Sequence, residues 1–164
     1  MKITLIATGG TLAKRYEPQQ GELVITSSND YLPSLLTYVS HNHQITVVDI
    51  IRKDSLDMTD DDRELIAQTL VTSDEYIIIL HGTDTMHESA SFLEQKQIKK
   101  VIIFVGAMHP LSILPFDGAM NLGSAIGFLQ RDELSFGVYI AMHGLVKPYQ
   151  NVVKNKKKGL FECR

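Results

Sequence analysis

The sequence predicts a single α/β domain built on a doubly wound, mostly parallel sheet. Three observations lead to this fold class. The chain has 164 residues, which fits one domain with a sizeable core. Its short apolar runs are nearly continuous, as expected of strands buried on both faces of a parallel sheet. Helix-like stretches separate these runs, and strand–helix alternation favours right-handed crossovers in a three-layer, Rossmann-like arrangement.

The predicted strands share an enrichment in β-branched or aromatic residues and a length of a few residues. They are Ile3–Ala7, Ile45–Ile51, Tyr76–Leu80, Val101–Val105 and Val138–Ala141. Because the runs are separated by helix-like stretches rather than tight turns, we expect neighbouring strands to be parallel.

The predicted helices lie between these strands. Thr59 precedes three aspartates, so its hydroxyl can cap a helix whose positive end the carboxylates stabilise. That helix continues with an apolar stripe of Leu65, Ile66, Thr69 and Leu70. Two further helices are expected at about Thr85–Gln95 and Gly118–Leu129.

Two segments lack a clear pattern. Lys14–Ser28 contains Pro18 and Gly21 and is predicted to be a long loop, of the kind that is usually functional or mobile. Lys154–Arg164 is basic and is expected to be partly disordered. The predicted organisation is therefore a domain at 1–153 followed by a basic tail at 154–164.

Composition excludes several classes of protein. The net charge of −3 gives no general attraction to nucleic acid or anionic membranes, and no aromatic residues interrupt the lysine cluster Lys154–Lys158. The single cysteine, Cys163, cannot form an intrachain disulfide. The first apolar stretch is too short for a signal peptide, and no run of about 20 apolar residues could span a membrane. We expect a cytoplasmic protein.

Polar or glycine-containing segments follow four of the predicted strands. They are Thr8–Thr11, Arg52–Asp57, His81–Thr85 and Gly106–Pro110. In doubly wound sheets, ligands bind beyond the carboxyl ends of the strands. The sequence therefore predicts one site at this edge of the sheet.

The segment His81–Met86 is the sharpest motif, whereas Gly9-Gly10 taken alone is a weak signal. Gly9-Gly10 before Thr11 could form a tight turn, a phosphate loop or a close approach to a ligand, although neither familiar nucleotide signature is present. Thr83 and Asp84 could cap the next helix or present their side chains to a ligand. A second threonine in a glycine-flanked loop favours a functional site.

Thr8-Gly9-Gly10-Thr11-Leu12-Ala13 and His81-Gly82-Thr83-Asp84-Thr85-Met86 resemble the two signature segments of the bacterial-type L-asparaginase/glutaminase family. Lesser matches follow in the family's order at Asp54–Met58, Val105–Met108, Asp117–Leu122 and Lys154. The resemblance covers nearly the whole chain and implies the fold of the family's N-terminal catalytic domain.

The resemblance implies an amidohydrolase that converts L-asparagine to L-aspartate and ammonia. Thr11 would be the nucleophile and form an acyl-enzyme, with Tyr16 as the assisting base. Tyr16 could equally be a partly buried loop aromatic. Thr83, Asp84 and Lys154 would activate the nucleophile or the water, although Lys154 could also be a solvated cation of the tail.

Substrate binding follows from charge and hydrogen bonding. Asp84 can hold the α-ammonium group, while the Ser55 hydroxyl and the amides of Leu56 and Gly82 can hold the α-carboxylate. Backbone amides of Thr11 and Thr83 could form the oxyanion hole. No cofactor is implied. A metal site is not expected, because His81 is predicted to end a strand whereas His87 starts a helix, which need not bring them together.

The sequence also departs from the family. Members usually carry a second, C-terminal domain, which this sequence does not contain, so we expect a short asparaginase-like protein of this domain alone. Leu56 stands where glutamine is common, and His109 where many relatives have arginine. A homo-oligomer, dimer or tetramer, would close the site. The alternatives are a weak or inactive binding module for amide amino acids and the amidase subunit of a tRNA-dependent amidotransferase.

Overall fold

The computed structural model describes residues 1–164 and contains one six-stranded sheet, in the order β4-β1-β5-β6-β7-β8. The strands of this sheet are β1 (Lys2–Gly9), β4 (Gln44–Lys53), β5 (Tyr76–Leu80), β6 (Val101–Val105), β7 (Gly137–Met142) and β8 (Leu145–Pro148). All neighbours are parallel except β7 and β8, which are antiparallel. The predicted doubly wound, mostly parallel sheet is confirmed.

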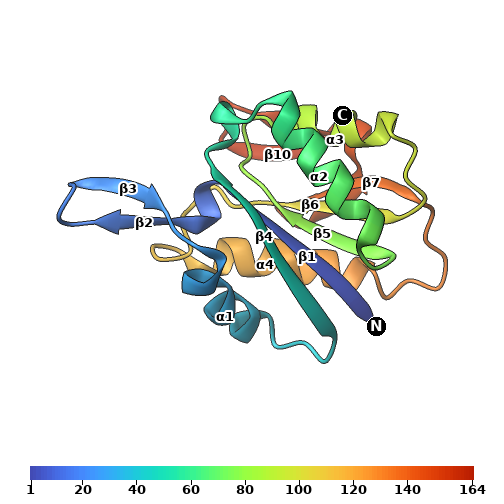
Figure 1. The fold of residues 1–164 in the computed structure, drawn as a ribbon, viewed down its shortest axis with the longest axis horizontal. Helices are drawn as coiled ribbons and strands as arrows, with labels where there is room; N and C mark the ends of the chain where they lie inside the picture. The colour runs from blue at the N-terminus through green and yellow to red at the C-terminus, as the bar shows by residue number, and fades with distance from the viewer.

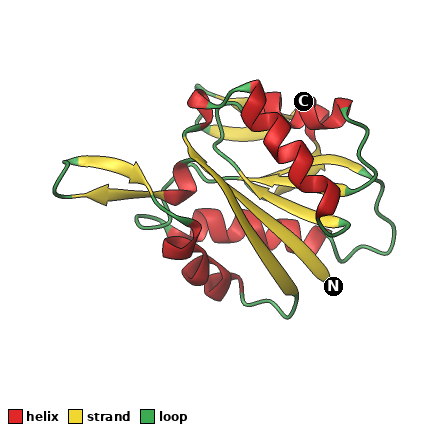
Figure 2. Cartoon of the chain, viewed as in Figure 1, coloured by secondary structure: helices red, strands yellow, loops and turns green.

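Helices cover both faces of the sheet (Figures 1 and 2). The helices α1 (Ser28–Val39) and α4 (Pro115–Phe128) pack on one face, and α2 (Asp60–Thr72) and α3 (Met86–Gln95) on the other. Successive residues of β5 alternate between the two apolar clusters, with Ile78 in one and Ile77 and Ile79 in the other. The central strands are therefore buried on both faces, which explains their continuous apolar sequences.

The structure agrees closely with the predicted central elements. The bounds of β5 and β6 are those that the apolar runs predict. Thr59 caps α2 in a capping box, because its hydroxyl accepts from Asp62 N while the Asp62 carboxylate accepts from Thr59 N. The helix α1 was not predicted, although Ser27 and Asp30 form a capping box at its start.

The prediction of a loop at Lys14–Ser28 is wrong. Most of this segment forms a hairpin of β2 (Lys14–Glu17) and β3 (Glu22–Ile25), which projects from the body of the molecule (Figure 1). Gly21 adopts a φ of 70° at the turn, and Pro18 lies in the turn rather than in a strand.

The expectation of a partly disordered tail is also wrong. The chain ends in a second hairpin, formed by β9 (Val152–Asn155) and β10 (Leu160–Cys163). Val152 and Phe161 are buried in the core cluster that lies under α2 and α3, and these two anchors hold the hairpin on the domain. The lysines that suggested disorder lie in or beside its turn. None of the helices is both long and apolar enough to cross a membrane.

Candidate active site

Three loops meet at the carboxyl edge of the sheet through glycine contacts. A Cβ atom added to Gly10 would lie 2.4 Å from the backbone N of Gly82. One added to Gly82 would lie 2.6 Å from the Cβ and Oγ atoms of Ser55. The segments after β1, β4 and β5 are therefore in direct contact, and any larger side chain at either glycine would separate them.

The loop after β5 carries a hydrogen-bonded cluster of a hydroxyl, a carboxylate and an ammonium group. Lys154 on β9 donates from Nζ to Thr83 Oγ1 at 2.8 Å and to Asp84 Oδ1 at 2.7 Å. Thr83 is buried, and the Lys154 side chain is largely buried. Lys154 thus lies in this cluster and is not a solvated cation of the tail.

Ser55 lies beneath the same loop. Asp84 N donates to Ser55 Oγ at 3.3 Å, and the Thr85 hydroxyl donates to the Ser55 carbonyl at 2.6 Å. The helix α3 starts after Thr85 without any side-chain cap. Neither Thr83 nor Asp84 therefore caps α3, which removes the alternative explanation for these two residues.

The backbone amides predicted to bind substrate differ in their surroundings. Leu56 N donates to Asp54 Oδ1 at 3.1 Å, so this amide already has an acceptor, and the Leu56 side chain is 68% exposed. The N–H groups of Gly82 and Thr83 donate to no acceptor in the protein. The amides of Gly82 and Thr83 thus keep free hydrogens, whereas the role predicted for the Leu56 amide conflicts with its bond to Asp54.

The structure places Thr11 at the carboxyl edge of the sheet, whereas Tyr16 lies on the projecting β2–β3 hairpin. Thr11 opens a 3₁₀ turn, Thr11–Ala13, directly after Gly10, and is half-buried with no hydrogen bond from its side chain. Tyr16 lies on the projecting hairpin opposite Leu23, is 55% exposed and makes no hydrogen bond to the other site residues. The base predicted for Thr11 is therefore carried by a peripheral element.

His81 has a positioning role that sequence reasoning missed. Its ring is buried, and Nδ1 lies 2.7 Å from the Gly82 carbonyl, to which only a protonated nitrogen can donate. Burial, with a smaller effect of Arg63, lowers the pKa of His81 to about 4. The ring packs edge-on against Phe104, whereas His87 packs against Tyr149, so the two histidines face different neighbours.

The loop after β6 is fixed by α4. The Asp117 carboxylate accepts from Met108 N at 2.8 Å and from His109 N at 3.0 Å, and Asn121 donates to the Gly106 carbonyl at 3.0 Å. These contacts explain why Asp117 and Asn121 accompany the Gly-Ala-Met segment in the sequence.

Sequence reasoning also missed an ion pair at the rim of the site. Lys14 Nζ lies 2.6 Å from Asp54 Oδ2. This hydrogen bond is the largest cause that lowers the pKa of the Asp54 carboxyl, and the nearby Lys154 charge adds to it. Lys14 and Asp54 are 40 residues apart, so only the folded arrangement of the first two loops reveals the pair.

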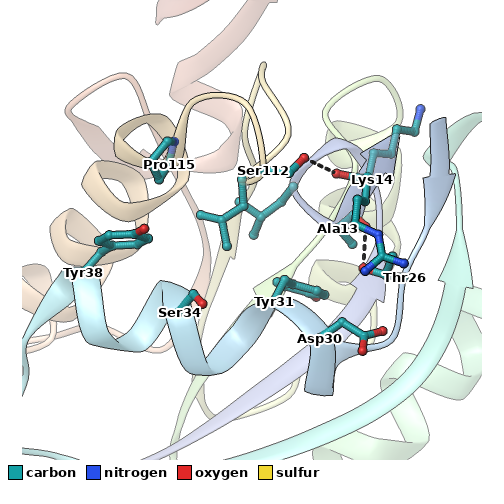
Figure 3. Close-up of a pocket in the computed structure, with 12 residues that line it drawn as sticks. Ala13, Lys14, Thr26, Asp30, Tyr31, Ser34, Tyr38, Ser112 and Pro115 are labelled. Carbon is teal, nitrogen blue, oxygen red and sulfur yellow. Dashed lines mark hydrogen bonds between the residues drawn. The ribbon is translucent and has the colours of Figure 1, made fainter. Parts of the chain in front are cut away.

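A cavity of about 280 Å³ lies between the 3₁₀ turn after Gly10, α1 and the 111–115 loop (Figure 3). The Ser112 hydroxyl donates to the Lys14 carbonyl, and the Thr26 hydroxyl donates to the Ala13 carbonyl. The Lys14 side chain extends away from the labelled residues of α1. None of the predicted site residues lines this cavity, so it is separate from the candidate site. Its lining residues hold the turn that Thr11 opens.

The fold and the site define a doubly wound α/β domain in which two glycine–threonine loops meet beside a lysine and a carboxylate. The family model described as "Asparaginase, N-terminal" matches residues 2–161. The chain belongs to the asparaginase family and corresponds to its N-terminal domain.

Several named relatives share this similarity. A "Probable L-asparaginase periplasmic" from Haemophilus influenzae is 31% identical, with 93% of this chain and 46% of the relative covered. A component of the glutamyl-tRNA(Gln) amidotransferase of Methanococcus vannielii is 32% identical, with 87% of this chain and 34% of the relative covered. The thermostable L-asparaginase from Thermococcus kodakarensis superposes with a TM-score of 0.83 at 25% identity, with 99% of this chain and 51% of that chain covered. The chain thus spans about half the length of the asparaginases it matches.

Proposed function

We propose that this chain is an L-asparaginase-type amidohydrolase that converts L-asparagine to L-aspartate and ammonia. The observation that carries the proposal is the Lys154–Thr83–Asp84 cluster beside the loop of Thr11. Membership of the asparaginase family supports the same reaction class. The contact between Gly10 and Gly82 joins the two threonine loops, so both hydroxyls belong to one edge of the sheet.

In the proposed first step, Thr11 Oγ attacks the side-chain amide carbon of asparagine. Tyr16 is the proposed base for the threonine proton, which requires the β2–β3 hairpin to bring its hydroxyl to Thr11; the proton then passes to the leaving nitrogen as the C–N bond breaks and ammonia departs. Backbone amides of Thr11 and Thr83 hold the oxyanion. The N–H group of Thr83 has no acceptor in the protein, which suits this role.

In the second step, water attacks the acyl ester and aspartate is released from Thr11. Lys154 donates to Thr83 Oγ1, so this oxygen acts as an acceptor and the hydroxyl hydrogen is left to orient another group. We assign Thr83 and Lys154 to the activation and orientation of the water. Asp84 holds Lys154 in place through the 2.7 Å ion pair.

Substrate capture would use the remaining polar groups. Asp84 Oδ1 accepts from Lys154, and its other oxygen can accept from an α-ammonium group. The Ser55 hydroxyl and the free Gly82 N–H group would hold the α-carboxylate. Because the Leu56 amide already donates to Asp54, we give it no part in binding.

The test is ammonia release from asparagine by the purified chain, beside Thr11→Ala and Thr83→Ala. We expect activity in the wild type, a lower rate with glutamine, and a loss of activity in both variants. Equal activity in all three proteins would reject these roles. Tight asparagine binding without ammonia release would instead select a binding module for amide amino acids, which the exposed position of Tyr16 makes the natural alternative.

A second candidate function is the amidase subunit of a tRNA-dependent amidotransferase. The similarity to the glutamyl-tRNA(Gln) amidotransferase component from Methanococcus vannielii favours it. Co-purification of the chain with another protein of such an enzyme or with an RNA would support this function. Recovery of the chain alone as a homo-oligomer would argue against it.

We also propose a cytoplasmic homo-oligomer, dimer or tetramer, because a neighbouring copy would help exclude water from the site. One similar structure is that of a probable cytoplasmic L-asparaginase from Campylobacter jejuni, whereas the Haemophilus relative is named as periplasmic. Light scattering on the purified chain would give the subunit number, and fractionation of the cells would give the compartment.

A further inference from the structure

The ion pair between Lys14 and Asp54 joins the two segments that would hold the nucleophile and the substrate carboxylate. Lys14 directly follows the turn that Thr11 opens, and Asp54 directly precedes Ser55. The two side chains are about one-quarter exposed and lie 2.6 Å apart between Nζ and Oδ2. The pair therefore lies at the rim of the site rather than on the open surface.

Asp54 poses an electrostatic problem for a carboxylate subsite at Ser55. Consecutive Cα atoms lie only about 3.8 Å apart, so a substrate carboxylate bound at Ser55 would be close to the Asp54 carboxylate. Like charges at such short range oppose each other's binding. Both Asp54 oxygens are already in use, since Oδ1 accepts from Leu56 N and Oδ2 accepts from Lys14.

We propose that Lys14 is a specificity-determining residue of this site, because its ammonium neutralises Asp54 and so allows the Ser55 subsite to accept the α-carboxylate of an amino acid. This inference rests on the proposed function and adds a requirement for substrates with a free α-carboxylate. Lys14 acts through Asp54 and need not touch the substrate.

The backbone of Lys14 is held by contacts that do not involve its side chain. The Lys14 carbonyl accepts from the Ser112 hydroxyl at 3.2 Å, and Lys14 pairs with Ile25 in the hairpin. Lys14 is one of the residues that line the neighbouring cavity, and its side chain extends away from the labelled residues of α1 (Figure 3). Removing its charge therefore changes the electrostatics at Asp54 while these backbone contacts remain.

The experiment is a cycle of Lys14→Met, Asp54→Asn and the double variant, with Lys14→Arg as the control that keeps the charge. Asparagine at position 54 keeps an acceptor for Leu56 N, so the cap of the turn survives. For each protein we would measure KM and kcat with L-asparagine and, by calorimetry, the Kd for L-aspartate.

We expect Lys14→Met to raise KM and Kd about tenfold, which corresponds to about 1.4 kcal/mol, with little change in kcat. The double variant should return both constants to near the wild-type values, because the charge that needs compensation is gone. Lys14→Arg should resemble the wild type. With the α-carboxamide of asparagine as substrate, Lys14→Met should have no effect on KM.

Two results would overturn the inference: a double variant as weak as Lys14→Met, or equal losses with asparagine and its α-carboxamide. A wild type that binds aspartate but releases no ammonia would reject the proposed hydrolysis while the calorimetric cycle still tests Lys14. A wild type that binds neither aspartate nor asparagine would reject both. Thermal unfolding of every variant would show whether a loss of binding reflects a loss of fold.

Discussion

The two sides of the candidate site differ in how firmly the fold holds them. On one side, Lys154 is fixed to Thr83 and Asp84 by hydrogen bonds of 2.8 and 2.7 Å, and the hairpin that carries it is anchored by buried apolar residues. On the other side, the Thr11 hydroxyl has no partner, and Tyr16 lies exposed on a projecting hairpin. The proposed activating cluster is therefore fixed to the core of the domain, whereas the base proposed for Thr11 is carried by a peripheral hairpin.

The largest effect is expected at the cluster of Lys154, Thr83 and Asp84. Lys154→Met should lower kcat for asparagine by about 10³–10⁴-fold, because the variant loses both the hydrogen bond to Thr83 and the partner of Asp84. Lys156→Met is the matched control, since Lys156 is an exposed lysine of the same hairpin turn. A similar loss in both variants would show that the hairpin's total charge matters rather than the cluster.

The second prediction concerns His81 on the same side. Its pKa of about 4 in the folded protein lies below its usual 6.5, so the unfolded state binds the additional proton first as the pH falls. The free energy of unfolding should therefore decrease between about pH 6.5 and pH 4, by about 3 kcal/mol from this group.

Urea unfolding across this pH range would measure the effect in the wild type and in His81→Asn, whose amide keeps a donor for the Gly82 carbonyl. The difference in slope between the two proteins reports His81 alone. Identical pH dependence in both would contradict the buried, neutral imidazole.

A third prediction concerns Tyr16 on the exposed β2–β3 hairpin. Tyr16→Phe should lower kcat by about 10²-fold, the lower end of the range for general acid–base catalysis. It should leave the unfolding midpoint unchanged because the side chain is exposed. Tyr38→Phe, at an exposed tyrosine of α1, serves as the control. Full activity of Tyr16→Phe would assign the base to another group.

The smallest expected effect concerns the contact between the two loops. Gly10 and Gly21 both have positive φ, but only at Gly10 would an added Cβ meet backbone atoms. Gly10→Ala should therefore lower the free energy of unfolding by about 1–3 kcal/mol more than Gly21→Ala, because only Gly10 adds an overlap to the backbone strain. Chemical denaturation would measure both. Equal losses would mean that the loops are not in tight contact.

The central sheet could be predicted from the sequence because burial on both faces leaves a signal within each strand. The β5 and β6 runs contain only apolar residues or tyrosine, so their bounds coincide with the apolar stretches. The loops that follow β1 and β5 could also be located, since glycine and hydroxyl residues directly follow these runs.

The rest of the fold depends on contacts that no short window contains. The terminal hairpin is held by Phe161, whose burial under α2 and α3 cannot be inferred from a lysine-rich neighbourhood. The β2–β3 hairpin has only four residues per strand and no regular alternation of polar and apolar residues, and its turn contains Pro18. The pairing of Lys14 with Asp54 is likewise set by the relative position of two loops.

The proposed mechanism requires that Thr11 is acylated beside the Thr83–Lys154 cluster. Rapid acid quenching of the enzyme during asparagine turnover, followed by peptide mass spectrometry, tests it most directly. We expect one aspartyl group on Thr11, in the peptide that contains Gly9 and Gly10. An aspartyl group on Thr83 or on any other residue would contradict it.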